Sequence, residues 1–294
     1  MTPKEKENAI KAGEIASKVK AYIKPLIKAN MPLLEIAEKI EDKIFELGAE
    51  PAFPTNLSIN DIAAHYTPSH DDKTLSHGLL KIDFGVHIDG IIADLAFSLD
   101  LENSKENKKL ISTSENALKK AIEKAKLGIP LGEIGKAVQD EIESNGFSPI
   151  INLSGHEMKE YELHAGLTIP NIDNKKTETL KKGLYAIEPF ATTGSGKVYD
   201  GKPSGIYVLI DDKNVRSPTA REILNFIDDE YNTLPFCSRW IVKKFGLKAL
   251  FALKQLEDNG NLHHFPQLIE VSHAKVSQAE HTILVDDKTI VTTE

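Results

Sequence analysis

The N-terminal part of the chain carries the hydrophobic pattern of two amphipathic helices. Apolar residues recur at three- and four-residue spacing through the first thirty residues, after a capping box that begins at Thr2. Pro25 is expected to kink or end this helix, because proline lacks the backbone N–H that a helix interior requires. The same spacing predicts a second helix over residues 33–47.

The strongest strand pattern lies between residues 79 and 98, which are mostly apolar on both sides of Asp89-Gly90. This dipeptide between β-forming residues predicts a hairpin with a two-residue type I′ turn. Helices are predicted again at about 104–127 and 131–145. Further strands are expected near 150–170, 184–192, 204–211 and 279–292.

Residues 218–258 interrupt the strand-rich second half of the chain with helical periodicity. Residues 213–260 hold eight basic and six acidic residues, a net charge of +2, whereas the rest of the chain carries −10. We find no internal repeat and no low-complexity linker. The pattern therefore predicts an α+β fold, with antiparallel strands covered by helices and a helical subdomain inserted between strands.

Composition narrows the class of protein. The chain has 294 residues, of which 40 % are hydrophobic and 27 % charged, as in an ordinary globular protein. No apolar run approaches the roughly 18 residues of a membrane span, and the charged N-terminus lacks a signal-peptide pattern. The single cysteine, Cys237, cannot form an internal disulfide, which favours a cytoplasmic location. The net charge of −8 argues against a dedicated nucleic-acid-binding protein.

Two aspartates share one face of the predicted hairpin. If Asp89-Gly90 forms the turn, Gly85 pairs with Asp94, and Asp83 lies on the same face because strand side chains alternate. The Cβ atoms of Asp83 and Asp94 are then roughly 6–8 Å apart. Their sequence neighbours are apolar, so two buried carboxylates would repel one another unless a cation lay between them. A divalent metal ion is the simplest candidate; the alternative is that one aspartate faces solvent at the end of the sheet.

Further polar side chains lie in apolar, strand-like stretches. Glu188 and Glu280 occupy runs in which an unpaired carboxylate is rarely tolerated. His156 and His164 are eight residues apart and would share one face of a strand. Each histidine alone is more often a hydrogen-bonded core residue, and each glutamate alone is often the partner of a lysine. Together, four carboxylates with one or two histidines suit two hard or borderline divalent ions such as Mn, Co, Fe(II) or Zn, which could activate water for hydrolysis.

These five ligand candidates and their surroundings resemble a known family. In chain order, Asp83, Asp94, His156, Glu188 and Glu280 are similar to the five-ligand signature of the pita-bread metallopeptidases. Four motifs resemble the type 2 methionine aminopeptidases of that family, and the short N-terminus resembles their archaeal members. The motifs are FPTN at 53–56, AAHYTP at 63–68, NLSGH at 152–156 and EHT at 280–282. Pro189 departs from the pattern, because many relatives carry a small hydroxyl residue after the glutamate.

The resemblance implies a domain division and a ligand set. Residues 1–194 and 266–294 would form the pita-bread catalytic domain, and residues 195–265 an inserted segment containing a helical, winged-helix-like subdomain. Asp94 and Glu280 would bridge two divalent metal ions. Asp83 would complete one metal site, and His156 with Glu188 would complete the other.

The resemblance also implies residues that contact the substrate. His164 is similar to a histidine that contacts the scissile peptide, and His65 to a second active-site histidine near the substrate amide. Aromatic edges suit a thioether, so apolar residues near these motifs are candidates for a methionine pocket. They are Phe53, Leu163, Phe190 and Phe265.

The function implied is removal of the initiator methionine from nascent polypeptides whose second residue is small. We expect a cytoplasmic monomer acting near the ribosome, without membrane or dedicated nucleic-acid binding. One alternative is an Xaa-Pro peptidase of the same fold, against which the AAHYTP motif and the helical insertion argue. The other is a non-catalytic pita-bread homologue that binds RNA or protein, against which the retention of all five ligands argues.

Overall fold

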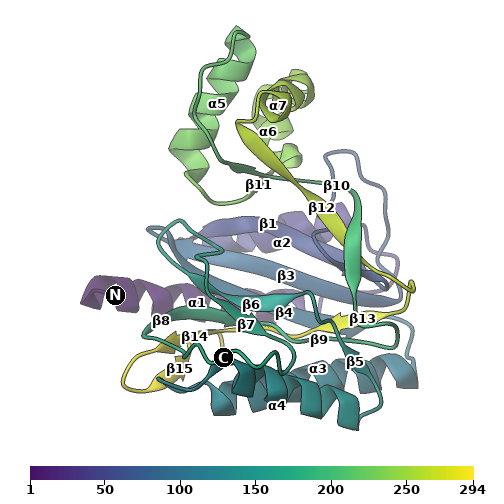
Figure 1. Ribbon diagram of the computed structural model, residues 1–294. Coiled ribbons are helices and arrows are strands. Elements are labelled where there is room, and N and C mark those ends of the chain that lie inside the picture. Colours follow the sequence, from purple (N-terminus) through teal and green to yellow (C-terminus); the bar gives the residue numbers. More distant parts are fainter.

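The computed structural model describes residues 1–294 and begins with helices packed on a three-stranded antiparallel sheet (Figure 1). The sheet has the order β1-β3-β4. Its elements are α1 (Pro3–Ile23), α2 (Leu33–Glu46), β1 (Glu50–Ile59), β3 (Leu79–Ile88) and β4 (Ile91–Asp100), with the short β2 (Ile62–Ala64) between β1 and β3. The predicted capping box at Thr2 is present, and α1 ends two residues before Pro25. Strand β1 was not predicted from the sequence.

The predicted hairpin is confirmed in turn type and register. Asp89 and Gly90 have φ values of 50° and 77°, the left-handed pair that a type I′ turn requires. Gly85 pairs with Asp94, as expected. Ile82 and Phe84 of β3 pack into the core under α1 and α2, together with Ala93 and Leu95 of β4. The alternate positions, including both aspartates, therefore face away from these helices.

A second layer of strands and helices covers that other face (Figure 1). Its helices are α3 (Lys105–Lys124) and α4 (Leu131–Ser144). One sheet has the order β13-β9-β5 and another the order β15-β14-β8-β6-β7. The strands are β5 (Ser148–Pro149), β6 (Ser154–Met158), β7 (Thr168–Pro170), β8 (Gly183–Ile187), β9 (Phe190–Thr192), β13 (Val276–Gln278), β14 (His281–Val285) and β15 (Thr289–Val291).

The strand expected over 184–192 is broken in two. Strand β8 ends at Ile187 and β9 begins at Phe190, in a different sheet, so Glu188 and Pro189 form the link between two sheets. Proline has no N–H to donate to a sheet ladder, which accounts for the interruption at this point. Glu188 is consequently placed at the junction of the two sheets.

A helical lobe stands above the sheets at the end of two long strands (Figure 1). Strand β10 (Val198–Leu209) leads into it and β12 (Leu262–Glu270) leads out, and the two pair antiparallel. The lobe contains α5 (Pro218–Tyr231), β11 (Phe236–Cys237), α6 (Ser238–Phe245) and α7 (Lys248–Asp258), whose apolar side chains share one core. The helices fall where the periodicity predicts them, whereas β12 was missed. No helix of the protein has the length and apolar character needed to cross a membrane.

A buried ion pair fastens this lobe to the N-terminal helices. Arg239 of α6 donates to both carboxylate oxygens of Glu41 on α2, at 2.7 and 2.8 Å, and to the carbonyl oxygen of Pro68 at 3.1 Å. The indole N–H of Trp240 donates to the same carboxylate at 2.9 Å. Only 4 % of Arg239 and 5 % of Glu41 are exposed. Such a bidentate, fully desolvated pair fixes the orientation of the lobe.

Replacement of Arg239 by methionine should lower the free energy of unfolding by about 3–5 kcal/mol, because Glu41 would remain buried without its partner. Urea denaturation measures the effect. The double variant Glu41→Leu/Arg239→Met should recover most of the loss, since it removes both charges. Lys136→Met, which breaks an exposed pair with Asp140, is the control and should cost less than about 0.5 kcal/mol. An Arg239→Met variant as stable as this control would contradict the role of the pair.

Candidate metal centre

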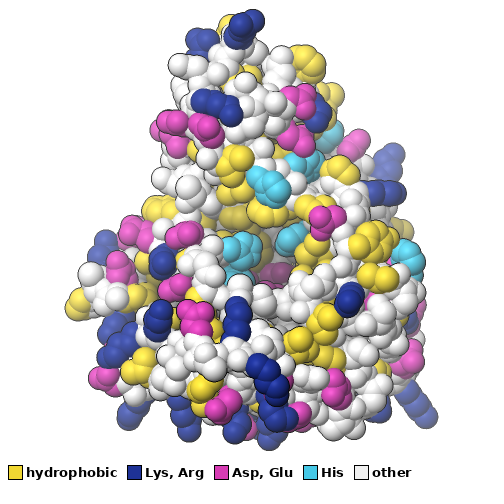
Figure 2. All heavy atoms as spheres, viewed as in Figure 1, with side chains coloured by type: hydrophobic (Ala, Val, Ile, Leu, Met, Phe, Trp, Pro, Cys, Tyr) yellow, Lys and Arg dark blue, Asp and Glu magenta, His cyan; other side chains and the backbone are white.

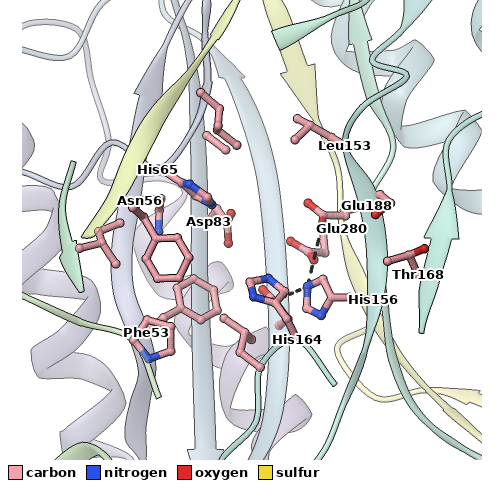
Figure 3. Close-up of a pocket in the computed structure, with 18 of the residues that line it drawn as sticks. Phe53, Asn56, His65, Asp83, Leu153, His156, His164, Thr168, Glu188 and Glu280 are labelled. Carbon is pink, nitrogen blue, oxygen red and sulfur yellow. Dashed lines mark ion pairs between the residues drawn. The ribbon is translucent and has the colours of Figure 1, made fainter. Parts of the chain in front are cut away.

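A cavity of about 350 Å³ opens between the two layers and the helical lobe. Figure 2 shows it as a hollow below the lobe, with histidine side chains at its rim and acidic side chains inside. The residues selected from the sequence all border this cavity, and Figure 3 shows several of them pointing into it. They are Phe53, His65, Asp83, Asp94, His156, Leu163, His164, Glu188, Phe190, Phe265 and Glu280.

The five predicted ligands come from separate elements. Asp83 and Asp94 project from β3 and β4, His156 from β6, Glu188 from the link between β8 and β9, and Glu280 from the link between β13 and β14. Ligand atoms of Asp94, His156 and Glu280 all lie within 4.8 Å of one another. The Nε2 atom of His156 is 3.6 Å from Asp94 Oδ2 and 3.9 Å from Glu188 Oε1. The fold thus brings together side chains that are up to 197 positions apart in the sequence.

Side-chain hydroxyls join the two layers beside these carboxylates. Thr282 Oγ1 accepts from the backbone N–H of Asp94 at 2.7 Å and lies 2.8 Å from the Asp94 carbonyl oxygen, to which it donates. Ser98 Oγ accepts from the Gln278 N–H at 3.0 Å and donates to the Gln278 carbonyl oxygen at 2.7 Å. Each hydroxyl replaces a missing ladder bond between β4 and the C-terminal strands, so the backbone under the carboxylates is held in place.

Burial raises the pKa of all four carboxyl groups. The pKa of Asp83 rises to about 7. The pKa values of Asp94, Glu188 and Glu280 lie well above their usual range, because burial is reinforced by repulsion from the neighbouring carboxylates. No lysine or arginine borders the cavity, so the alternative of lysine-paired glutamates is wrong.

The donor set fits a divalent cation. The Oδ1 atoms of Asp83 and Asp94 are buried without any hydrogen-bond partner, which is costly unless a ligand occupies them. Burial and the neighbouring His164 lower the pKa of His156 to about 3. Its imidazole is therefore neutral near pH 7, the form that binds metal ions. A cluster of carboxylate oxygens with one neutral imidazole matches hard or borderline divalent ions.

Gln278 belongs to this centre and was missed in the sequence. Its Nε2 atom lies 3.3 Å from Asp83 Oδ2 and 3.3 Å from Glu188 Oε2. The donated hydrogen bonds lower the pKa of both carboxyl groups, against the larger effect of burial. Its position in the sequence could have indicated this role, because a residue two places before Glu280 in an extended chain points to the same side as Glu280.

Two further histidines face the cavity. Desolvation within the cavity lowers the pKa of His65 to about 4 and also lowers the pKa of His164, although His65 is only partly buried and His164 is partly open to solvent. His65 has a φ of 64°, and its Nδ1 lies 3.2 Å from the carbonyl oxygen of Pro266. A carbonyl only accepts, so the neutral ring carries its proton on Nδ1 and leaves Nε2 as an acceptor. The His164 ring packs edge-on against His156, with centroids 4.5 Å apart.

Phe53 lines the cavity beside the hairpin. A Cβ atom at Gly85 would lie 2.4 Å from the Phe53 ring, so the ring occupies space that only glycine leaves open. Gly85 is also the partner of Asp94 in the hairpin. Phe53, Leu163 and Phe190 are each at most 8 % exposed, and Phe265 packs edge-on against His65 at 5.7 Å between ring centroids. These side chains give the cavity an apolar wall next to the carboxylates.

Comparison of the sequence with models of protein families identifies the family of this chain. The sequence model described as metallopeptidase family M24 matches residues 7–286. The chain belongs to metallopeptidase family M24. This membership and the pita-bread fold predicted from the sequence are confirmed. Family M24 membership implies use of a divalent metal ion, and the carboxylate cluster provides a site that fits one.

Within family M24, the chain is similar along its length to methionine aminopeptidases. It is 48 % identical over 297 residues to the methionine aminopeptidase of Pyrococcus abyssi, covering 98 % of this chain and 99 % of that protein. A solved structure of a thermophilic Arx1 superposes with a TM-score of 0.85 at 16 % identity, covering 99 % of this chain and 91 % of that one. The methionine aminopeptidase of Thermotoga maritima gives a TM-score of 0.72 at 22 % identity, covering 100 % and 98 %.

The metal-free protein should become less stable as the pH rises from about 4 to about 7. The folded state holds a proton on Asp83 up to pH 7, whereas the unfolded chain releases it near 3.8, so raising the pH favours unfolding. Mn²⁺ should reverse the trend, because the deprotonated carboxylates bind it. Thermal unfolding between about pH 5 and pH 8, with EDTA or Mn²⁺, measures both effects.

The variant Asp83→Asn serves as the control for this titration, because it removes the carboxyl group at the same position. Its metal-free form should lose stability less steeply over this pH range than the unaltered protein. Equal steepness in the two proteins would show that Asp83 is not responsible. An absence of any stabilisation by Mn²⁺, Co²⁺, Fe²⁺ or Zn²⁺ at about pH 8 would contradict the metal centre.

Proposed function

We propose that this chain is a metal-dependent methionine aminopeptidase that removes the initiator methionine of nascent proteins when the second residue is small. The observation that carries the proposal is one cavity in which an apolar wall adjoins four buried or partly buried carboxyl groups and neutral histidines. The near-full-length similarity to proteins named methionine aminopeptidase supports it.

The metal centre we propose contains two divalent ions. Asp94 and Glu280 would be shared between the ions, Asp83 would complete one site, and His156 with Glu188 would complete the other. The ions are Co, Mn, Fe(II) or Zn, all of which accept carboxylate and imidazole ligands. When bound, they would supply the Lewis acidity and the activated water for peptide hydrolysis.

His65 and His164 would orient the scissile peptide. The free Nε2 of His65 is an acceptor and can take a hydrogen bond from a substrate N–H. His164 lines the cavity beside His156, and a neutral imidazole there can donate to the substrate carbonyl oxygen as negative charge develops on it.

The apolar wall would receive the methionine side chain. Phe53, Leu163, Phe190 and Phe265 present ring edges and a branched aliphatic chain, which suit an unbranched, polarisable thioether. We propose that this protein acts as a cytoplasmic monomer near the ribosome, with residues 1–194 and 266–294 as the catalytic domain and 195–265 as the inserted segment.

Hydrolysis of a Met-Ala-Ser peptide by the metal-loaded protein tests the function directly. We expect release of methionine in the presence of Mn²⁺, Co²⁺ or Fe²⁺, and loss of activity with a chelator. An Xaa-Pro peptide should not be cleaved. Cleavage of the Xaa-Pro peptide instead would favour an Xaa-Pro peptidase, and inactivity with every one of these ions would favour a non-catalytic binding protein.

The variant His164→Ala should reduce kcat by about 10²–10³ while metal content stays unchanged, because the imidazole stabilises developing charge without holding the ion. Steady-state kinetics and metal analysis of the purified variant measure the two quantities. Asp94→Asn is the contrasting variant and should lose both activity and bound metal. Normal turnover in His164→Ala would remove this histidine from the reaction.

A further inference from the structure

The side-chain amide of Gln278 lies between two carboxylates of the centre. Its Nε2 lies 3.3 Å from Asp83 Oδ2 on one side and 3.3 Å from Glu188 Oε2 on the other. A primary amide has two N–H groups, so it can donate to both carboxylates at once. Only 1 % of the residue is exposed, so the amide itself is held away from solvent.

The position of this amide is fixed from outside the carboxylate cluster. The backbone of Gln278 exchanges two hydrogen bonds with the Ser98 hydroxyl, at 3.0 and 2.7 Å. On its other side Gln278 pairs with Phe190 of β9, two residues after Glu188. The side chain therefore starts from backbone that is anchored to β4 and β9, and it holds the carboxylates in place.

The type of side chain matters for a site that takes a cation. Two carboxylates this close repel one another when both are ionised. A lysine between them would cancel their charge and compete with a metal ion, whereas a neutral amide supplies donors and leaves the negative charge intact. Hydrogen bonds from residues beyond the ligands commonly set both the orientation of those ligands and the affinity for the metal.

We propose that Gln278 is a positioning residue that ties Asp83 to Glu188 and so preorganises the centre for divalent ions. The inference rests on the proposed function, in which these two carboxylates belong to different metal sites. Gln278 thereby couples the two sites through one side chain and contributes to the affinity of both ions.

Calorimetric titration of metal-free protein with Mn²⁺ tests the proposal. Gln278→Met keeps the length of the side chain and removes both donors, and it should weaken Mn²⁺ binding about 10–100-fold. The visible absorption bands of the Co²⁺-loaded variant should shift, because the two ligands change orientation. The thermal unfolding temperature of the metal-free variant should fall by no more than about 10 °C and unfolding should stay cooperative, because two carboxyl groups lose a donor while the packing volume is kept.

Asn107→Leu is a matched control outside the cavity. Asn107 is also a buried amide that donates to two carboxylates, those of Asp100 at 2.9 Å and Glu102 at 3.4 Å. This variant should bind Mn²⁺ within about twofold of the unaltered protein, since distant sites act independently. Gln278→Asn retains the amide on a shorter chain that cannot span both carboxylates. Gln278→Asn should therefore lose as much affinity for Mn²⁺ as Gln278→Met. If Gln278→Met does not fold, Gln278→Asn replaces it in the experiment.

Two results would overturn the proposal and are distinguishable. If both Gln278 variants bind Mn²⁺ with unaltered affinity while the unaltered protein cleaves Met-Ala-Ser, the positioning role is wrong and the proposed function stands. If the unaltered protein neither binds Mn²⁺ nor cleaves the peptide, the proposed function fails, and the role of Gln278 fails with it.

Discussion

Four carboxyl groups, two of them buried and two partly buried, surround one cavity that no lysine or arginine borders, and their mutual repulsion is the main electrostatic constraint on this site. Removing so many acids from water is unfavourable unless a cation compensates them. The fold brings them together through backbone that is rigid for other reasons. The Thr282 and Ser98 hydroxyls fix one side, and the packing of β3 and β4 against α1 and α2 fixes the other.

The helical lobe completes the cavity from a different direction. Its strands bring Phe265 and Ile206 to the cavity wall, and Arg239 anchors α6 to Glu41 in the N-terminal layer. The Glu41–Arg239 pair and the carboxyl cluster of the cavity both consist of ionisable groups, but the two differ in their charge balance. The Glu41–Arg239 pair is internally neutral and can stay buried, whereas the carboxyl cluster must either keep protons or bind an added cation to lower its charge. One electrostatic arrangement stabilises the structure, and the other prepares it for a ligand.

Local patterns in the sequence predicted the hairpin and the main helices, whereas the resemblance to the pita-bread family supplied His65 and the apolar residues of the cavity. The spacing of His156 and His164 predicted one shared strand, but His164 lies in the loop between β6 and β7. Asp89-Gly90 determined the register, and the register placed Asp83 and Asp94 on one face. Strands β1 and β12 were missed because their prolines and polar residues obscure the alternation, and their pairing is decided by distant partners. Gln278 was missed because its role depends on two carboxylates 195 and 90 residues away. The only local signal of this contact is the place of Gln278 two residues before Glu280, which puts both side chains on one face of an extended chain.

Gly85 gives one strand position two functions. The strand contributes no side chain there, and the ring of Phe53 from β1 takes the vacant space. The hairpin that presents the aspartates is thus also the support for an aromatic wall of the cavity. Any side chain introduced at this position would clash with that ring and with Ala52 beside it, so β1 could not keep its place against the hairpin. The position of the aromatic wall is therefore tied to the absence of a side chain on the strand that carries Asp83.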